Sequence, residues 1–153
     1  MTDPISAFYL AFQRLDPESM VAQYHPNIIF SDPAFGTLEG QDAKDMWSML
    51  CSRSKDLEIT FSDVRTTEDE GSARWKAQYT FGATGRLVKN DIQARFKLMD
   101  GMIVSHHDTF DLRKWAQQAM GWKGFLIGGT NFFRKNLQQR TKKMLADYQR
   151  SNK

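Results

Sequence analysis

His106 and Asp108 are the residues whose type and spacing are best suited to proton transfer. They stand two residues apart in an expected strand over 102–111, so their side chains share one face. Val104 and Phe110 fall on the same face and indicate that it is the apolar interior. A histidine beside a carboxylate in an apolar cavity can act as a general acid and base or polarise a carbonyl group. If the face assignment of the strand is off by one residue, His107 and Thr109 point inward. His106 and Asp108 then form an exposed pair that contributes little to stability.

Asp32 is a second candidate for proton transfer. It ends an expected strand over 28–32, and if Ile28 and Phe30 face the core, Asp32 faces it too. A carboxylate against apolar walls has a raised pKa because desolvation disfavours its charged form, and this makes it a useful base near neutral pH. The alternative is an aspartate that caps the turn beginning at Pro33.

Aromatic residues complete the candidate site. Tyr9 lies in the apolar stripe of the first expected helix, so its hydroxyl is expected to reach the interior, as an oxyanion donor or as an ordinary core tyrosine. Other aromatic side chains could form a wall that holds a flat or ring-shaped ligand, or could simply pack the core. They are Trp47, Trp75, Tyr79, Phe96 and Phe30.

The sequence predicts neither a metal site nor a cofactor. A metal needs three or four suitably spaced ligands, and His25, His106 and His107 occur without a CxxC or HExxH motif. The glycines at 82–85 lack the spacing and the lysine of a phosphate-binding loop. The single cysteine, Cys51, falls in a helical apolar stripe and is expected to be buried and unreactive.

Hydrophobic periodicity indicates the elements that position these residues. Asp3-Pro4 and Asp16-Pro17 are helix start signals. Helices are expected over about 4–15, 17–24, 41–52, 113–120 and 131–150. Gly36 and Gly40 are expected to bracket a loop, and alternating apolar residues between 57 and 111 predict four strands in hairpins.

This order of elements predicts an α+β fold. We expect a cone-shaped α+β barrel, in which a curved antiparallel sheet carries the N-terminal helices over its concave face and is followed by an extra C-terminal helix. Residues 1–112 are expected to form the cone, and residues 113–153 a helical extension packed on the same domain.

Composition fits one globular domain. The chain has 153 residues, of which 41% are hydrophobic and 25% charged, and these values exclude a disordered chain. No run approaches the ~20 apolar residues that span a bilayer. The N-terminus shows no secretory signal and there is one cysteine, so we expect a cytoplasmic protein.

The charge is distributed unevenly. Residues 1–112 hold 11 Lys and Arg against 17 Asp and Glu, whereas residues 113–153 hold 10 Lys and Arg and only Asp147. A solvated helix face, a cover for the cone or a dimer contact would explain the basic tail, and no nucleic acid partner is expected. An anionic membrane surface, contacted through 122–150, is the remaining alternative.

Three segments together resemble the nuclear transport factor 2-like superfamily, which includes ketosteroid isomerases and SnoaL-like polyketide cyclases. They are the opening helix at 8–12, the run 28–33 with Gly40 and a helix after it, and the hairpin from 95–98 to 103–108. The resemblance covers about residues 4–112. The tail from Arg113 onward looks like an extension found in an uncharacterised bacterial subgroup.

The resemblance implies roles for several residues. Asp32 falls where ketosteroid isomerases keep their general base, and Tyr9 where they keep an oxyanion-stabilising tyrosine. Asp108 looks like the counterpart of the acidic residue on the last strand of SnoaL-like cyclases. The second oxyanion donor of the isomerases is replaced by Ala94 or Gln93. This departure argues against steroid isomerase activity.

Two kinds of function are therefore open. One is a small apolar ligand, ring-shaped or polyketide-like, bound in an internal cavity with cofactor-free acid/base chemistry such as isomerisation, cyclisation or hydration. The other is a non-catalytic ligand-binding module or a dimeric scaffold. A homodimer is expected from the resemblance, with the outer side of the strands at or near the interface or in solvent.

Overall fold

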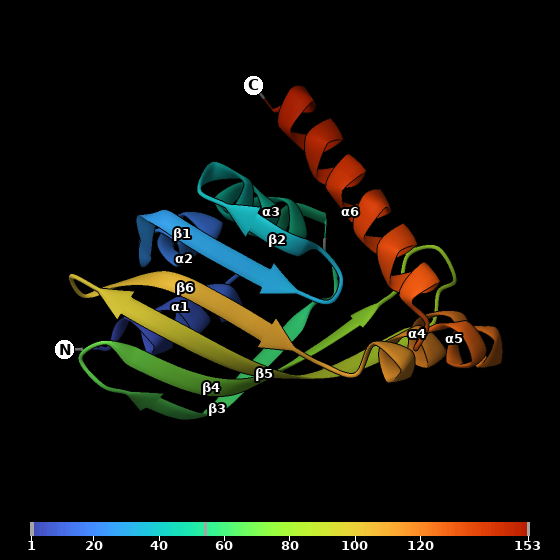
Figure 1. The fold of residues 1–153 in the computed structure, drawn as a ribbon, viewed down its shortest axis with the longest axis horizontal. Coiled ribbons are helices and arrows are strands. Elements are labelled where there is room, and N and C mark those ends of the chain that lie inside the picture. The colour runs from blue at the N-terminus through green and yellow to red at the C-terminus, as the bar shows by residue number, and fades with distance from the viewer. Residues whose placement is uncertain (1, 54, 153) are drawn as a thin grey trace.

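The computed structural model describes residues 2–53 and 55–152 and has a mixed α+β architecture (Figure 1). A six-stranded sheet runs in the order β2-β1-β6-β5-β4-β3. The strands are β1 (Tyr24–Asp32), β2 (Gly36–Glu39), β3 (Glu58–Thr66), β4 (Glu70–Thr80), β5 (Leu87–Met99) and β6 (Met102–Thr109). Strand β1 runs parallel to β6, and every other pair is antiparallel. The sheet is curved but does not close into a barrel.

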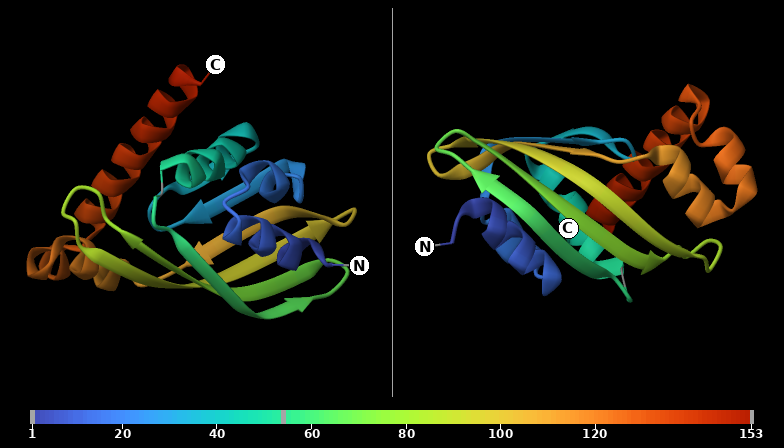
Figure 2. Two further views of the ribbon diagram at one scale, coloured as in Figure 1. Left: turned by 180° about the vertical axis from the view of Figure 1, so that it is seen from behind. Right: turned by 90° about the horizontal axis from the view of Figure 1, so that it is seen from below.

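Three helices cover the concave face: α1 (Pro4–Gln13), α2 (Pro17–Val21) and α3 (Gln41–Arg53) (Figure 2). The first two begin at the expected caps, where Asp3 accepts a hydrogen bond from the Ser6 amide at 2.9 Å and Asp16 from the Ser19 amide at 3.1 Å. The α+β cone predicted from the sequence is therefore confirmed, as an open cone rather than a closed barrel.

The apolar core lies between these helices and the sheet. In β5 every second side chain from Ile92 to Leu98 is buried and the intervening ones are exposed, as the alternation predicts. An irregularity in the β5–β6 pairing, between Lys97 and Leu98, shifts the phase of β6. Ile103 is therefore buried and Val104 only half-buried, which corrects the expected face at that position.

Two local predictions were wrong. The segment between Gly36 and Gly40 forms strand β2, because these two glycines adopt positive φ angles of 73° and 55° at the turns that flank it. Tyr24 begins β1 and does not belong to a helix. The physical reason is Pro26, which disfavours the helical conformation of the preceding His25.

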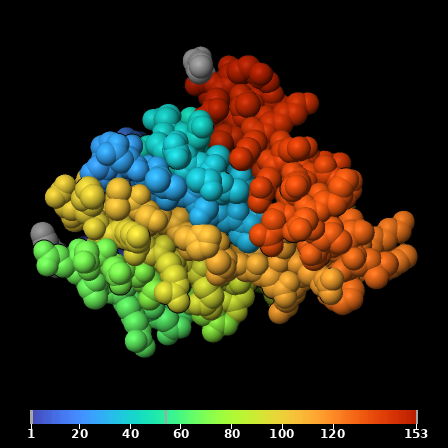
Figure 3. Space-filling model, in the orientation of Figure 1, coloured from blue at the N-terminus to red at the C-terminus, as the bar shows by residue number. Residues whose placement is uncertain are grey.

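The C-terminal helices pack at one end of the sheet. Helices α4 (Leu112–Met120) and α5 (Trp122–Ile127) form a projection beyond the strands, and α6 (Asn131–Ser151) returns past β2 and α3 (Figures 1 and 3). The Thr141 hydroxyl donates to the Ala34 carbonyl oxygen at 2.8 Å, and the Gln138 amide donates to that of Pro33 at 3.2 Å. Helix α6 thus holds the turn that follows Asp32. No helix in the described part of the chain is long and apolar enough to span a membrane.

Glycines allow α5 to approach α4 closely. A Cβ atom at Gly124 would lie 2.1 Å from the Ala116 carbonyl oxygen, and one at Gly128 would lie 2.7 Å from the Ala116 Cβ. Neither distance is compatible with a side chain, so the two helices fit together only because both positions are glycine.

We expect Gly124→Ala to lower the free energy of unfolding by about 1–3 kcal/mol, because the added methyl group must displace backbone atoms of α4. Gly82→Ala is the matched control, since a Cβ there meets no atom within 4 Å. Urea denaturation of both variants measures the difference. Equal stability of the two variants would contradict the close packing of α4 against α5.

Candidate functional site

A buried chain of hydrogen bonds crosses the interior of the cone. The Trp47 indole N–H donates to the Tyr24 hydroxyl at 2.8 Å, and that hydroxyl lies 2.7 Å from His106 Nδ1. His106 Nε2 lies 2.9 Å from Asp108 Oδ1, to which the Trp75 indole also donates at 3.4 Å. A neutral imidazole donates through one ring nitrogen and accepts through the other, so the tautomer that donates from Nε2 to Asp108 accepts at Nδ1 from the Tyr24 O–H. Every member of the chain then has a partner.

Aromatic rings enclose His106, which is fully buried. The centroid of its ring lies 4.4 Å from that of Phe96, 5.1 Å from Phe30 and 5.4 Å from Phe8, while Trp47 stacks on it at 5.9 Å. The structure thus places His106 and Asp108 on the interior face, as predicted. It leaves no room for a ligand against the imidazole, so His106 can act only through the groups it holds.

Asp32 lies beside Asp108 at the end of the sheet where the C-terminal helices pack. The parallel register pairs Phe30 with His106 and Ser31 with His107, which makes the two aspartates neighbours on adjacent strands. Asp32 as a residue is half-buried, but protein surrounds its carboxyl group. Burial, reinforced by the nearby Asp108 carboxylate, raises the pKa of Asp32 to about 7 against the hydrogen bonds from Phe35 and Ala34, which lower it.

Asp32 also caps its own turn. Its Oδ1 accepts from the Ala34 amide at 2.9 Å and from the Phe35 amide at 2.6 Å. Within the described residues, Oδ2 has no hydrogen-bond partner. The capping role and the basic role considered for Asp32 therefore use different oxygen atoms and are compatible.

Tyr9 is fully buried, and its hydroxyl is the only buried side-chain polar atom of the described residues without a hydrogen-bond partner. Burial, with Asp108 and Tyr24 nearby, raises the pKa of Tyr9 well above its ordinary value. The Tyr9 ring stacks on Phe61 and lies 6.0 Å from Trp75. The structure thus brings the neutral Tyr9 hydroxyl to the same interior as Asp108 but gives it no acceptor.

The predicted aromatic wall divides into two parts. Trp47, Trp75, Phe30 and Phe96 are buried and pack around the polar chain. Tyr79 is half-buried at the end of the sheet, and the Trp115 indole donates to its hydroxyl at 2.8 Å. Burial raises the pKa of Tyr79 against this hydrogen bond, and the charge of nearby Asp32 adds to the rise.

Sequence reasoning missed Tyr24, which joins Trp47 to His106. Its assignment to a helix hid it, because helical spacing gives it no relation to the strand that carries His106. Pro26 restricts only His25, the residue directly before it, so Tyr24 is placed in β1 by its pairing with Ile103 of β6, which no local signal shows.

Two clefts, of about 460 and 400 Å³, lie on the surface around Phe110. The larger is lined by residues of α4 and of the α5–α6 turn, and the smaller by the outer face of β5 and by α4. None of the residues predicted for catalysis or ligand binding lines either cleft. Over residues 2–53 and 55–152, no group of three His, Cys, Asp or Glu side chains is arranged to hold a metal ion.

The first two thirds of the chain match a known family model. The family model of the SnoaL-like domain matches residues 5–106, which include α1, the whole of β1 and most of β6. The chain belongs to the SnoaL-like domain family. No curated protein matches this SnoaL-like chain.

Solved structures share the fold at low sequence identity. TerC, co-crystallised with polyporic acid, is 18% identical with a TM-score of 0.64, over 75% of this chain and 94% of TerC. IdmH, a proposed polyketide cyclase from Streptomyces antibioticus, is 21% identical with a TM-score of 0.63, over 75% and 94%. An epoxide hydrolase of the LEH-like type from M. tuberculosis is 18% identical with a TM-score of 0.62, over 82% and 88%. At these low sequence identities, the similarity shows only that the fold is shared.

The structure separates the two positions considered for a second oxyanion donor. Ala94 is buried and pairs with Asp108 across the β5–β6 ladder, whereas Gln93 is exposed on the outer face. Ala94 therefore holds the interior position of this SnoaL-like domain, and it carries no polar group.

We expect Tyr24→Phe to lower the free energy of unfolding by about 1–3 kcal/mol, because the Trp47 indole and His106 Nδ1 lose their shared partner inside the core. Tyr9→Phe is the matched control. It removes a hydroxyl that has no partner and is expected to leave stability unchanged or slightly higher. Chemical denaturation tests both, and an equal loss in the two variants would contradict the hydrogen-bond chain.

Asp32 is expected to make stability fall as pH rises. Its folded-state pKa of about 7 lies above the ordinary value of 3.8, so between these values the folded chain binds more protons than the unfolded chain. The free energy of unfolding contributed by Asp32 is therefore highest below the lower value and declines until pH passes the upper one. Asp32→Asn should flatten this slope, and denaturation at a series of pH values measures it. An identical slope in the variant would exclude the raised pKa.

Proposed function

We propose that this SnoaL-like domain is a cofactor-independent acid/base enzyme, in which Asp32 moves protons of a small apolar ligand at the end of the cone where the C-terminal helices pack. The observation that carries the proposal is the position of Asp32 beside Asp108, with a free Oδ2 and a pKa of about 7. A carboxyl group with this pKa can both accept and return a proton near neutral pH.

The buried chain of hydrogen bonds from Trp47 to Asp108 supports the role of Asp32. Asp108 is held by His106 and Trp75, and His106 in turn by Tyr24. A carboxylate fixed in this way keeps its distance from Asp32, and its charge adds to the rise in the pKa of Asp32 that burial causes. His106 and Tyr24 thus serve as positioning residues.

The Tyr9 hydroxyl is assigned to the ligand. A buried donor without a partner costs free energy, and such a group in a native interior requires an explanation. A ligand oxygen that reaches the interior would be its acceptor, so Tyr9 would stabilise the negative charge that develops when Asp32 removes a proton. Entry of the ligand requires some of the surrounding aromatic side chains to move.

The lining favours an apolar ring compound that carries a carbonyl or epoxide oxygen. The aromatic side chains around Tyr9 and Asp108 offer flat apolar surfaces, and Tyr9 offers one donor. TerC was crystallised with polyporic acid, and the M. tuberculosis relative is an epoxide hydrolase. Both precedents fit this class, which leaves proton abstraction and water activation as the two reactions to test.

Exchange of deuterium from solvent into cyclic ketones tests the base directly, because it requires only removal and return of a proton beside the carbonyl. We expect Asp32→Asn to slow exchange by about 10²-fold or more. In the wild type, exchange should decline as pH falls through about 7, because Asp32 must be ionised. Mass spectrometry of the ketone measures the rate.

Asp91→Asn is the matched control, since this exposed carboxylate pairs with Arg74 on the outer face. It should exchange at the wild-type rate. Equal rates in the Asp32 and Asp91 variants would remove Asp32 from the reaction.

The second candidate is a non-catalytic ligand-binding or scaffold module. The observation in its favour is the filled interior, in which His106 is enclosed by rings and Asp32 caps its own turn. Thermal stabilisation by polyporic acid with no exchange activity on any ketone would select this candidate. The homodimer implied by the resemblance remains a prediction, which sedimentation would test.

A further inference from the structure

Helix α5 exposes its large apolar side chains. Trp122 is 69% exposed and Leu126 61%, and Phe125 and Ile127 are also exposed. Phe132, at the start of α6, is 77% exposed. We call these five residues the α5 face. Helix α5 and the start of α6 belong to the projection at the end of the sheet (Figure 3).

The exposure results from the way α5 packs. An amphipathic helix of a soluble domain buries its large apolar residues and exposes the polar ones. Helix α5 does the reverse, since Gly124 and Gly128 are buried against Ala116 and leave the aromatic and aliphatic side chains outside. Because glycine is required at both positions, the outward arrangement is built into the packing.

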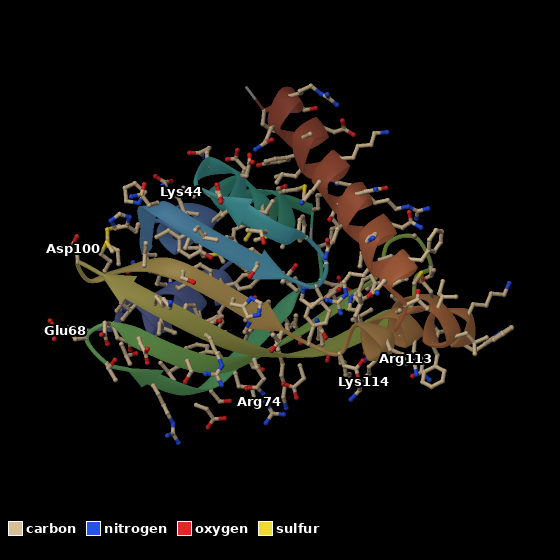
Figure 4. The ribbon with its side chains drawn as sticks, in the orientation of Figure 1. Lys44, Glu68, Arg74, Asp100, Arg113 and Lys114 are labelled. Atoms are coloured by element: carbon tan, nitrogen blue, oxygen red, sulfur yellow. The ribbon has the colours of Figure 1, made fainter. Side chains whose placement is uncertain are left out.

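Basic side chains surround the α5 face. The Arg113 guanidinium lies 5.3 Å from the centre of the Phe125 ring, and the Lys123 ammonium 5.9 Å from that of Trp122. Arg113 and Arg134 also line one cleft, and Arg113 and Lys114 project from α4 beside α5 (Figure 4). The sequence from 112 to 146 contains eight Lys and Arg residues and no Asp or Glu. Asp111 borders the same cleft, but its carboxylate caps α4 by accepting from the Lys114 amide.

We propose that the α5 face docks this protein onto an anionic phospholipid membrane. Aromatic and aliphatic side chains insert at the level of the lipid headgroups, and the surrounding guanidinium and ammonium groups meet lipid phosphates. The apolar centre of the α5 face matches the lipid interior, and its basic margin matches the lipid phosphates. No acidic residue between 112 and 146 repels the membrane.

A second copy of this protein is a poorer partner for the α5 face than an anionic membrane is. Two such faces would bring Arg113, Lys123 and Arg134 of one chain against the same cations of the other, and like charges at a contact oppose association. The membrane surface supplies the opposite charge and accepts the apolar side chains. This inference does not depend on the chemistry proposed for Asp32.

Binding to phospholipid vesicles tests the proposal with the full chain. We expect the protein to sediment with vesicles that mix phosphatidylcholine and phosphatidylglycerol in equal shares, and much less with phosphatidylcholine alone. Raising the salt concentration should weaken the binding, because salt screens the attraction of the basic residues. Trp122 fluorescence should shift to the blue, and the other tryptophans, Trp47, Trp75 and Trp115, are already buried.

Variants distinguish binding through the α5 face from nonspecific adsorption of exposed apolar side chains. Trp122→Ser with Leu126→Ser should weaken vesicle binding by about tenfold or more, because two large apolar side chains no longer leave water. Leu87→Ser with Met99→Ser is the matched control, since these residues are 51% and 50% exposed on β5, outside the α5 face, and binding should persist. Trp122→Phe should keep binding and lose the blue shift.

A charge series completes the test. Lys123→Gln with Arg134→Gln should weaken binding to anionic vesicles, whereas Arg95→Gln with Lys97→Gln, on the outer face of β5, should change it less. Several outcomes would overturn the proposal: no binding to anionic vesicles, equal binding to both lipid compositions, or unchanged binding in the Trp122/Leu126 variant. A vesicle-free dimer that dissociates in that same variant, without vesicle binding by the wild type, would assign the face to a second copy instead.

Discussion

The burial of His106 and Asp108 in an aromatic interior is the constraint on which the rest of the structure depends. An ionisable pair removed from water is costly unless every polar atom finds a partner. Here the partners come from different elements: Tyr24 from β1, Trp47 from α3 and Trp75 from β4. The sheet must therefore curve and α3 must cover it before the pair is satisfied, so the polar chain ties the strands to the helices.

The same hydrogen-bond chain bears on the reactivity that we propose for Asp32. Aromatic rings enclose His106, and hydrogen bonds from His106 and Trp75 fix the position of the Asp108 charge. Asp32 ends the neighbouring strand, where its carboxyl group is out of water and close to that charge. The charge of Asp108 thus adds to the rise in the pKa of Asp32 that burial of the Asp32 carboxyl group causes.

The C-terminal helices are linked to the surroundings of Asp32 by specific contacts. Thr141 and Gln138 of α6 bond the two carbonyl groups that follow Asp32, and Trp115 of α4 bonds Tyr79 beside it. Helix α5 belongs to the same assembly but turns its apolar residues outward. The extension therefore has one side that holds the Asp32 turn and another that exposes apolar side chains.

By itself, the sequence determined the elements whose signals are local. The Asp-Pro caps set the starts of α1 and α2, and the period-2 alternation set β3 to β6 and the inward side of His106 and Asp108. It also singled out Asp32 and Tyr9 as candidates, and the order of elements predicted the cone. Only the tertiary structure decided which side chains meet: the partnership of Tyr24 with His106, the missing partner of Tyr9, and the outward face of α5. These depend on strand register, a shift in the β5–β6 pairing and the closeness of two helices, and such long-range packing leaves no periodic trace along the chain.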